Sequence, residues 1–348
     1  MRIYSLDLIK IVAIFLIILS HVSLYFMNRE PLDFGVLFIR QTGQFGVVIF
    51  YMASGYFLLN NHREDQFHYV MSKSKAIALA LVFWLLFYYL YDNVILAYFL
   101  GAPHYDFWSY INTDRTASEA SHLWFLFSII GLYFIMPLLR PVFVEANHQM
   151  LIYLIIALIL LANLTLIEKI MNSLFGIPFF IHPALLMSSQ VFGLTSFLIG
   201  GYFGLVYRHT ILSARDYFPV AALALLSFCV LTWLTQQWGI VFFYGKFYNL
   251  PLQITAVCVF YLMLHTRFTW LEGIISRIGS KTLGIYLVHN IFVIEINNPT
   301  LYDRLYPAFN FLSVYGFIVI YGVVAFALSY MLCCLLCRQC WLNRLISL

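Results

Sequence analysis

The sequence predicts an all-α integral membrane protein, a bundle of about ten transmembrane helices with both termini in the cytoplasm. Three observations carry this prediction: the composition, the long apolar runs and the distribution of basic residues. Hydrophobic residues make up 63% of the 348 residues and charged residues 10%, with a mean hydropathy of +0.88. Soluble domains contain about 25% charged residues, so a water-soluble fold is excluded. The 25 Tyr and 34 Phe residues suit the aromatic belts of a membrane protein.

Long apolar runs give the expected order of the elements. A transmembrane helix needs about 20 mostly apolar residues. The candidate spans cover about 5–27, 36–59, 76–100, 122–140, 149–167, 185–207, 217–235, 250–265, 281–296 and 310–336. Six prolines are expected to lie between these runs, because proline tends to end helices: Pro31, Pro103, Pro141, Pro178, Pro183 and Pro307.

The basic residues orient the bundle. With the N-terminus inside, 13 of the 19 Lys and Arg residues fall on the cytoplasmic side and 6 outside. An even number of spans then places both termini in the cytoplasm. The bias also explains the net charge of +4 without a nucleic-acid partner. The outer loops near 101–121 and 168–184 are too short to form domains, so we expect one transmembrane domain over 1–348 with no appended soluble domain.

The first span carries three ionisable residues in the stretch LDLIKIVAIFLIILSHV: Asp7, Lys10 and His21. At about 100° per residue, all three share one helical stripe with Tyr25. Lys10 and His21 are about 16 Å apart along the axis, so one helix offers a cation near the cytoplasmic face and an imidazole further out. Ionisable residues within a membrane usually face the protein interior and mark function.

Each of these residues also has a structural interpretation. Asp7 and Lys10 are spaced i,i+3, the spacing of a surface ion pair at the start of a helix. His21 is also compatible with a neutral core histidine bonded to a neighbouring helix. The functional interpretation gains weight from the shared stripe.

Two further stretches place chemistry-bearing residues within spans. The run SHLWFLFSIIGLYFIMPLLRP begins with His122 and Trp124 at the outer interface, where Trp124 by itself is typical of a belt anchor. The run IGSKTLGIYLVHNIF puts Tyr286 and His289 at i,i+3, on one helix face.

No metal site is expected from the sequence. The chain has no H-E-x-x-H motif and no other histidine pair spaced i,i+4. The cysteines near the C-terminus have a C-x-x-C-x-x-C spacing, but no histidine accompanies them, and we interpret them as small apolar residues at the end of a helix.

Together these stretches resemble the acyltransferase family 3 of integral membrane O-acyltransferases over nearly the whole chain. The opening YSLDLIKIVAIFLIILSHV is similar to the family's first helix, with a basic residue, ten intervening residues and a histidine. FYMASGYFL, HLWFLFSIIGLYFIMPLL and LGIYLVHNIF resemble later landmarks in the same order. Two departures are Lys10, where many relatives have arginine, and Gln44, which stands where a further basic residue is common; Arg40 lies one turn earlier.

The resemblance implies transfer of an acyl group, usually acetyl, from cytoplasmic acetyl-CoA or another acyl-CoA to a hydroxyl. The acceptor would be a cell-surface polysaccharide or its lipid-linked precursor, and the location the bacterial inner membrane. The family assigns the catalytic role to His21, with Lys10 as its basic partner, and we expect Asp7 to shape the inner mouth. Lysine cannot make the bidentate phosphate contact of arginine, so donor binding would differ in detail.

Acyl transfer also requires groups beyond the base. An imidazole with a pKa near 6.5 suits a general base, and an oxyanion donor is needed. The candidates on the acceptor or oxyanion side are His289, Tyr286, His122 and Trp124. The candidates for the CoA phosphates are Lys10, Arg63, Lys73, Arg277 and Lys281. We expect no metal; the expected partners are the glycan acceptor, membrane lipid, and glycan-synthesis proteins or a second copy of the chain.

Two other classes stay open at this point. A polysaccharide or lipid-linked-sugar exporter would use the polar stripe as a substrate path, although transporters often show inverted repeats and broken helices, and neither is clear in the sequence. A non-catalytic partner in a glycan-synthesis complex is the second. Within the enzyme interpretation, His21 acts as a base or as a covalent acyl carrier, and the base is the simpler choice.

Overall fold

A computed structural model of the chain describes residues 4–27, 33–60, 65–101, 103–112, 119–144, 147–182, 191–207, 212–239, 249–266, 269–293, 307 and 311–346. Within these ranges the regular elements are all helices, without a strand. Six of the described helices are long and apolar enough to cross a membrane: Tyr4–Met27, Phe34–Leu59, Gln66–Phe99, Ala120–Phe143, Ala214–Trp238 and Val314–Leu336. The chain is therefore an all-helical, multi-pass membrane protein, as predicted.

Helices also occupy the other predicted spans, in shorter or interrupted form. Helices α7 (His148–Ala162) and α8 (Leu164–Leu174) are bent by 49° at Asn163 and count as a seventh span if taken together. Helices α9 (Val191–Val206) and α12 (Leu250–Leu264) are apolar but short. The total of about ten spans and the cytoplasmic placement of both termini stay predictions.

The chain divides into two compact units that interleave in sequence. The first comprises Met1–Ala13, Gln44–Glu64 and Ile135–Trp270, and the second Ile14–Gly43, Asp65–Phe134 and Leu271–Leu348. Three helices run through both: α1 (Tyr4–Met27), α2 (Phe34–Leu59) and α6 (Trp124–Val144). The expectation of one domain over 1–348 stays a prediction.

The first unit also contains α7, α8, α9, α10 (Ala214–Trp238) and α12, and α10 packs along α12. Its helix starts are capped by side chains: Asn147 Oδ1 accepts from the backbone N–H of Met150, and Asn249 Oδ1 from that of Leu252. Such caps satisfy backbone donors that a helix start leaves open. Asn163 Oδ1, at the bend between α7 and α8, accepts from Leu250 N at 2.6 Å and ties this bend to α12.

Helices α2 and α9 approach each other at glycines within the first unit. A Cβ at Gly55 would collide with the carbonyl oxygen of Phe197, and one at Gly200 with that of Met52. Asn60 Nδ2 donates to the Gly201 carbonyl at 2.9 Å. Small residues allow this backbone approach in membrane helices.

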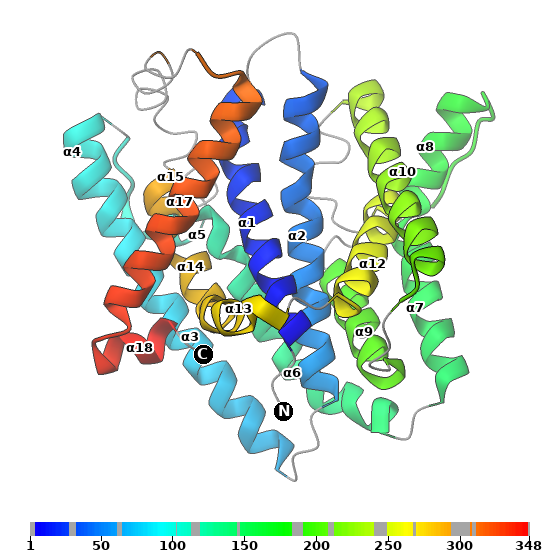
Figure 1. Cartoon of the computed structure of the whole chain (residues 1–348), viewed down its shortest axis with the longest axis horizontal. Coiled ribbons are helices and arrows are strands. Elements are labelled where there is room, and N and C mark those ends of the chain that lie inside the picture. Colours follow the sequence, from blue (N-terminus) through cyan, green and yellow to red (C-terminus); the bar gives the residue numbers. More distant parts are fainter. Residues whose placement is uncertain are drawn as a thin grey trace. The chain divides into compact units, whose positions relative to one another are not determined.

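The second unit contains one long helix that is continuous over several elements (Figure 1). Helix α3 (Gln66–Leu90) continues through a π-helical turn, η1 (Tyr91–Leu96), into α4 (Ala97–Leu100). The other elements are α5 (Phe107–Asn112), η3 (Glu119–Leu123), part of η5 (Thr269–Leu271), α13 (Glu272–Gly279), α14 (Thr282–Val288), α15 (Asn290–Val293), α17 (Val314–Leu336) and α18 (Cys340–Ile346). Helix α14 packs on α17, and α18 packs on α3.

The prediction that Pro141 lies between two spans was wrong. Helix α6 continues through both Pro137 and Pro141 to Val144. The two prolines are four residues apart and therefore leave their missing N–H groups on one face of the helix. Membrane helices tolerate proline when neighbouring groups satisfy the freed carbonyls.

Candidate functional site

The site forms in the second unit around His21, on the part of α1 that belongs to this unit. The His21 side chain is half-buried, and its Nδ1 lies 3.1 Å from His289 Nε2 and 3.2 Å from Asn290 Oδ1. The two imidazole rings are 5.1 Å apart between centroids and tilted by 32°. His21 is therefore joined directly to residues 268 and 269 positions further along the chain.

A break in the helix between α14 and α15 presents His289 and Asn290 to His21. Helix α14 ends at Val288 and α15 begins at Asn290, with His289 in the turn between them; both side chains are fully buried. His289 Nδ1 donates to the Tyr286 carbonyl at 2.6 Å. His289 keeps helical backbone angles, so the interruption lies in the hydrogen-bond ladder, and in a membrane protein the carbonyls near it require partners from the protein itself.

Tyrosine hydroxyls supply further partners for this broken segment. Tyr88 donates to the Leu287 carbonyl at 2.8 Å, Tyr91 to that of Ile291 at 3.3 Å, and Tyr321 to that of Phe292 at 2.8 Å. These donors come from α3, η1 and α17, which surround the break. The turn at His289 is thus held from several sides, a feature of a rigid site.

The third histidine of the site, His122, lies at the end of η3 and is 3% exposed. Its Nδ1 lies 3.0 Å from Asn290 Nδ2, and its backbone carbonyl accepts a hydrogen bond from the Tyr286 hydroxyl. Its ring meets that of His289 edge-on at 5.0 Å and that of Tyr88 at 5.1 Å. We call His21, His122, His289 and Asn290 the histidine network.

The contacts of the network determine which ring nitrogen of His21 carries the hydrogen. The Tyr286 carbonyl only accepts, so neutral His289 has its hydrogen on Nδ1 and a lone pair on Nε2. That lone pair faces His21 Nδ1, which must therefore be an N–H. His21 Nε2 is left with the lone pair that a base requires.

The same logic orients the Asn290 amide. Since His21 Nδ1 carries a hydrogen, the amide atom facing it is the oxygen, in agreement with the Oδ1 contact. The amide nitrogen then donates to His122 Nδ1, which places the hydrogen of neutral His122 on Nε2. One asparagine thereby sets the hydrogen-bonding state of two histidines.

Arg40, on α2, lies next to the network in the second unit. Its guanidinium donates to the Ser20 carbonyl at 2.8 Å and to Ser20 Oγ at 3.1 Å, while Ser20 Oγ donates to the Arg40 carbonyl at 2.6 Å. Gly43 makes this approach possible, because a Cβ there would collide with Ser20. The structure thus fixes a cation beside the residue that precedes His21.

Asp7 and Lys10 belong to the first unit, on the earlier part of α1. Lys10 Nζ lies 2.8 Å from Asp7 Oδ1, and it also lies over the ring of Phe57 at 5.9 Å. Asp7 is 3% exposed. The Asp7 carboxylate therefore neutralises part of the charge of Lys10, which the resemblance makes the basic partner of His21.

The other predicted residues are dispersed over the second unit. Lys73 is half-buried on α3, the Arg277 side chain on α13 donates to the Gly273 carbonyl at 3.3 Å, and Lys281 precedes α14. Trp124 begins α6, half-buried, and meets Phe125 edge-on. Arg63 lies outside the described residues.

Sequence reasoning identified the three histidines separately but missed Asn290. The signal was present in the stretch LVHNIF, where a polar residue follows His289 directly within an apolar run. For metals, the described part of the chain contains no group of three His, Cys, Asp or Glu residues that could hold an ion.

This site holds an imidazole in place with a second histidine and an amide, an arrangement that is capable of acid–base chemistry. The family model described as an acyltransferase domain matches residues 3–335, nearly the whole chain. The chain belongs to this acyltransferase family, which confirms the resemblance of its motifs, and its general activity is that of a membrane acyltransferase. No curated protein and no solved structure matches the chain.

Proposed function

We propose that the protein transfers an acyl group, most often acetyl, from cytoplasmic acyl-CoA to a hydroxyl of a cell-surface polysaccharide or its lipid-linked precursor. The observation that supports this most is the hydrogen-bonded contact of His21 Nδ1 with His289 and Asn290. With its hydrogen on Nδ1, His21 carries its lone pair on Nε2, the atom that would take the proton of the acceptor hydroxyl. The protein would act in the bacterial inner membrane, with its termini in the cytoplasm.

His21 is the general base of the proposed reaction. The acceptor oxygen forms a bond to the thioester carbonyl carbon while its proton passes to His21 Nε2. The carbon–sulfur bond then breaks, and the proton moves from His21 to the sulfur of CoA. A positioned base of this kind accelerates a reaction by about 10²- to 10⁴-fold.

The oxyanion of the tetrahedral intermediate needs a hydrogen-bond donor. Tyr286 and His289 direct their own donors at the backbone carbonyls of His122 and Tyr286. We therefore assign this role to His122, whose hydrogen lies on Nε2. Trp124, two residues further on, would contact the acceptor sugar.

The donor would bind through its phosphates at the cytoplasmic side. Cations suit this role, and those we assign to it are Lys10, Arg63, Lys73, Arg277 and Lys281. Asp7 would orient Lys10, whose Nζ it contacts at 2.8 Å. Further partners would be glycan-synthesis proteins or a second copy of the chain.

The test is acetyl transfer by the purified protein beside His21→Ala, with His104→Ala as a matched control in an exposed loop of the same unit. We expect His21→Ala to lower kcat by about 10²-fold or more, while the control keeps wild-type activity. Full activity in His21→Ala, with both variants eluting as folded monodisperse protein, would contradict the assignment.

Lys10→Ala tests the donor side separately. We expect the KM for acetyl-CoA to rise about tenfold with little change in kcat, because Lys10 contributes to binding and not to chemistry. Lys10→Arg should restore KM, since arginine retains the charge. An unchanged KM would remove Lys10 from the donor site.

An exporter of polysaccharide or lipid-linked sugar is the second candidate. The broken segment α14–α15 favours it, because discontinuous membrane helices often build transporter sites. Absence of turnover by the wild type, with acyl-CoA and glycan acceptors supplied, would favour this alternative.

A further inference from the structure

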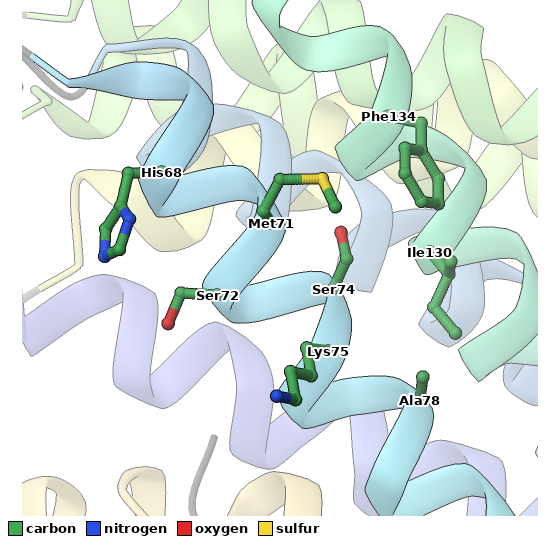
Figure 2. A pocket seen from close by; sticks show the side chains of 8 residues that line it. All are labelled: His68, Met71, Ser72, Ser74, Lys75, Ala78, Ile130 and Phe134. Carbon is green, nitrogen blue, oxygen red and sulfur yellow. The ribbon is translucent and has the colours of Figure 1, made fainter.

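A second candidate site lies in the second unit, between the first turns of α3 and the middle of α6. It is a cavity of about 570 Å³ lined by His68, Met71, Ser72, Ser74, Lys75, Ala78, Ile130 and Phe134 (Figure 2). This volume falls in the range of pockets that hold small molecules. None of these residues belongs to the histidine network.

The cavity has a polar and an apolar side, which follow from helical geometry. His68, Ser72 and Lys75 are spaced i, i+4 and i+7 and form one stripe of α3. Met71, Ser74 and Ala78 form the neighbouring stripe, and in Figure 2 Met71 and Ser74 lie on the side of α3 toward Ile130 and Phe134. A ligand that fills the cavity is therefore amphipathic.

Ser74 gives an independent indication of a ligand. Its side chain is 4% exposed and lines the cavity, yet its Oγ has no hydrogen-bond partner among the described residues. Helical serines usually bond the carbonyl four residues earlier, as Ser54 Oγ does to Phe50 O at 2.9 Å. A buried hydroxyl without a partner is costly, and an oxygen of a ligand would satisfy it.

The charge of the cavity is positive. Lys75 is exposed and forms no ion pair with a residue that the structure describes, and His68 supplies ring nitrogens beside it. Helix α3 belongs to a helix that is long and apolar enough to cross a membrane. Only 33% of the most apolar stretch of this helix is buried inside the protein, so we expect most of that stretch to face lipid. Phe134 and Met71, 56% and 43% exposed, continue the apolar side of the cavity onto the surface.

We propose that this cavity binds one anionic membrane phospholipid. The phosphate contacts Lys75 and His68, an ester or glycerol oxygen accepts from Ser74 Oγ, and an acyl chain lies along Met71, Ile130 and Phe134. Lysines near a membrane surface attract anionic lipids in this way. The proposal does not depend on the acyltransferase reaction.

The test is native mass spectrometry of the full-length protein released from nanodiscs of equimolar phosphatidylglycerol and phosphatidylcholine. We expect the wild type to retain phosphatidylglycerol, and Lys75→Gln to weaken this retention about fivefold, the contribution of one lysine near an anionic surface. Lys73→Gln is the matched control, because Lys73 lies on the same helix but does not line the cavity. Equal losses in both variants would overturn the proposal, since they would indicate general attraction.

A second pair of variants tests the cavity without changing charge. Ala78→Trp fills it, whereas Leu79→Trp places the same ring on the exposed side of α3, where Leu79 is 55% exposed. We expect only Ala78→Trp to lose the lipid. Retention of the lipid in Ala78→Trp would overturn the proposal. Displacement of the lipid by CoA in the wild type, but not in Lys75→Gln, would also overturn it, because that result would assign the cavity to a nucleotide.

Discussion

Two contact regions, one in each unit of the molecule, are held together in different ways. In the first unit, α2 and α9 meet through backbone atoms at Gly55 and Gly200. In the second, the segments around His289 are joined by side-chain hydrogen bonds, among them those of Tyr88 and Asn290. Close backbone packing favours a rigid support, and one side-chain hydrogen bond, from Asn60 to the Gly201 carbonyl, accompanies it. A network of buried polar side chains suits chemistry, because every member has a defined donor or acceptor role.

This difference between the two contact regions reflects how helices associate in a membrane. Lipid gives no hydrophobic force between helices, so association depends on close packing or on hydrogen bonds. In the first unit, α2 and α9 depend mainly on close packing, where the sequence places small residues. Unit two uses hydrogen bonds where the helix breaks at His289 and exposes carbonyls that need partners.

The largest effect is expected where backbone packing is disturbed. Gly55→Ala places a methyl group against the Phe197 carbonyl, and we expect a loss of about 3 kcal/mol in unfolding free energy. Gly131→Ala is the control, since a Cβ there meets nothing within 4 Å and alanine is the better helix former. Thermal unfolding in detergent should show opposite signs for the two variants; equal midpoints would mean that α2 and α9 can move apart.

The second largest effect is expected on kcat, when the histidine network is disturbed. His289→Phe keeps an aromatic ring but removes both the donor to Tyr286 and the acceptor for His21. We expect kcat to fall about 10²-fold, because the Nδ1 hydrogen of His21 loses one of its acceptors. Tyr91→Phe, which removes a hydroxyl that donates to the same broken segment, should keep activity within about threefold. A comparable loss in both variants would point to structural damage and not to a role in positioning.

A smaller and more selective effect is expected at Asn290. Asn290→Asp retains an oxygen that accepts from His21 but loses the donor to His122, whereas Asn290→Leu loses both. We expect the leucine variant to be about tenfold less active than the aspartate variant in kcat, with similar melting temperatures. Equal activities would show that the contact with His21 does not govern the reaction.

The smallest effect lies at the edge of the second unit. The exposed Asp33 carboxylate accepts from the Tyr315 hydroxyl at 2.7 and 2.8 Å, which lowers the pKa of Asp33 from its usual 3.8. The stabilisation is therefore present above pH 3.8 and is lost as the pH falls through the lowered pKa.

We expect Tyr315→Phe to lower the unfolding free energy only slightly at neutral pH, because Asp33 is exposed to solvent, and to have no effect once Asp33 is protonated. Unfolding measured between neutral and acidic pH tests this. A cost that persists unchanged in acid would mean that the ring packing of Tyr315 matters and not the hydrogen bond. Tyr153→Phe, at an exposed site in the first unit, is the control.

The sequence was informative about types of residue and much less so about their partners. It singled out His21, His122 and His289 because ionisable groups are rare within apolar runs. It treated His122 and His289 as separate candidates on the acceptor side, since spacing along one helix says nothing about neighbouring helices. It passed over Asn290, whose importance depends on lying between two histidines.

The sequence by itself determined that this is a membrane protein, that it is helical and to which family it belongs. These properties depend on composition, on runs of apolar residues and on the order of the motifs. Tertiary structure decided the chemistry of the site. Which nitrogen of His21 carries a hydrogen depends on His289, 268 residues away, and on the turn that aims its ring. Such a choice is made by hydrogen bonds between distant segments, and these exist only after the helices have packed.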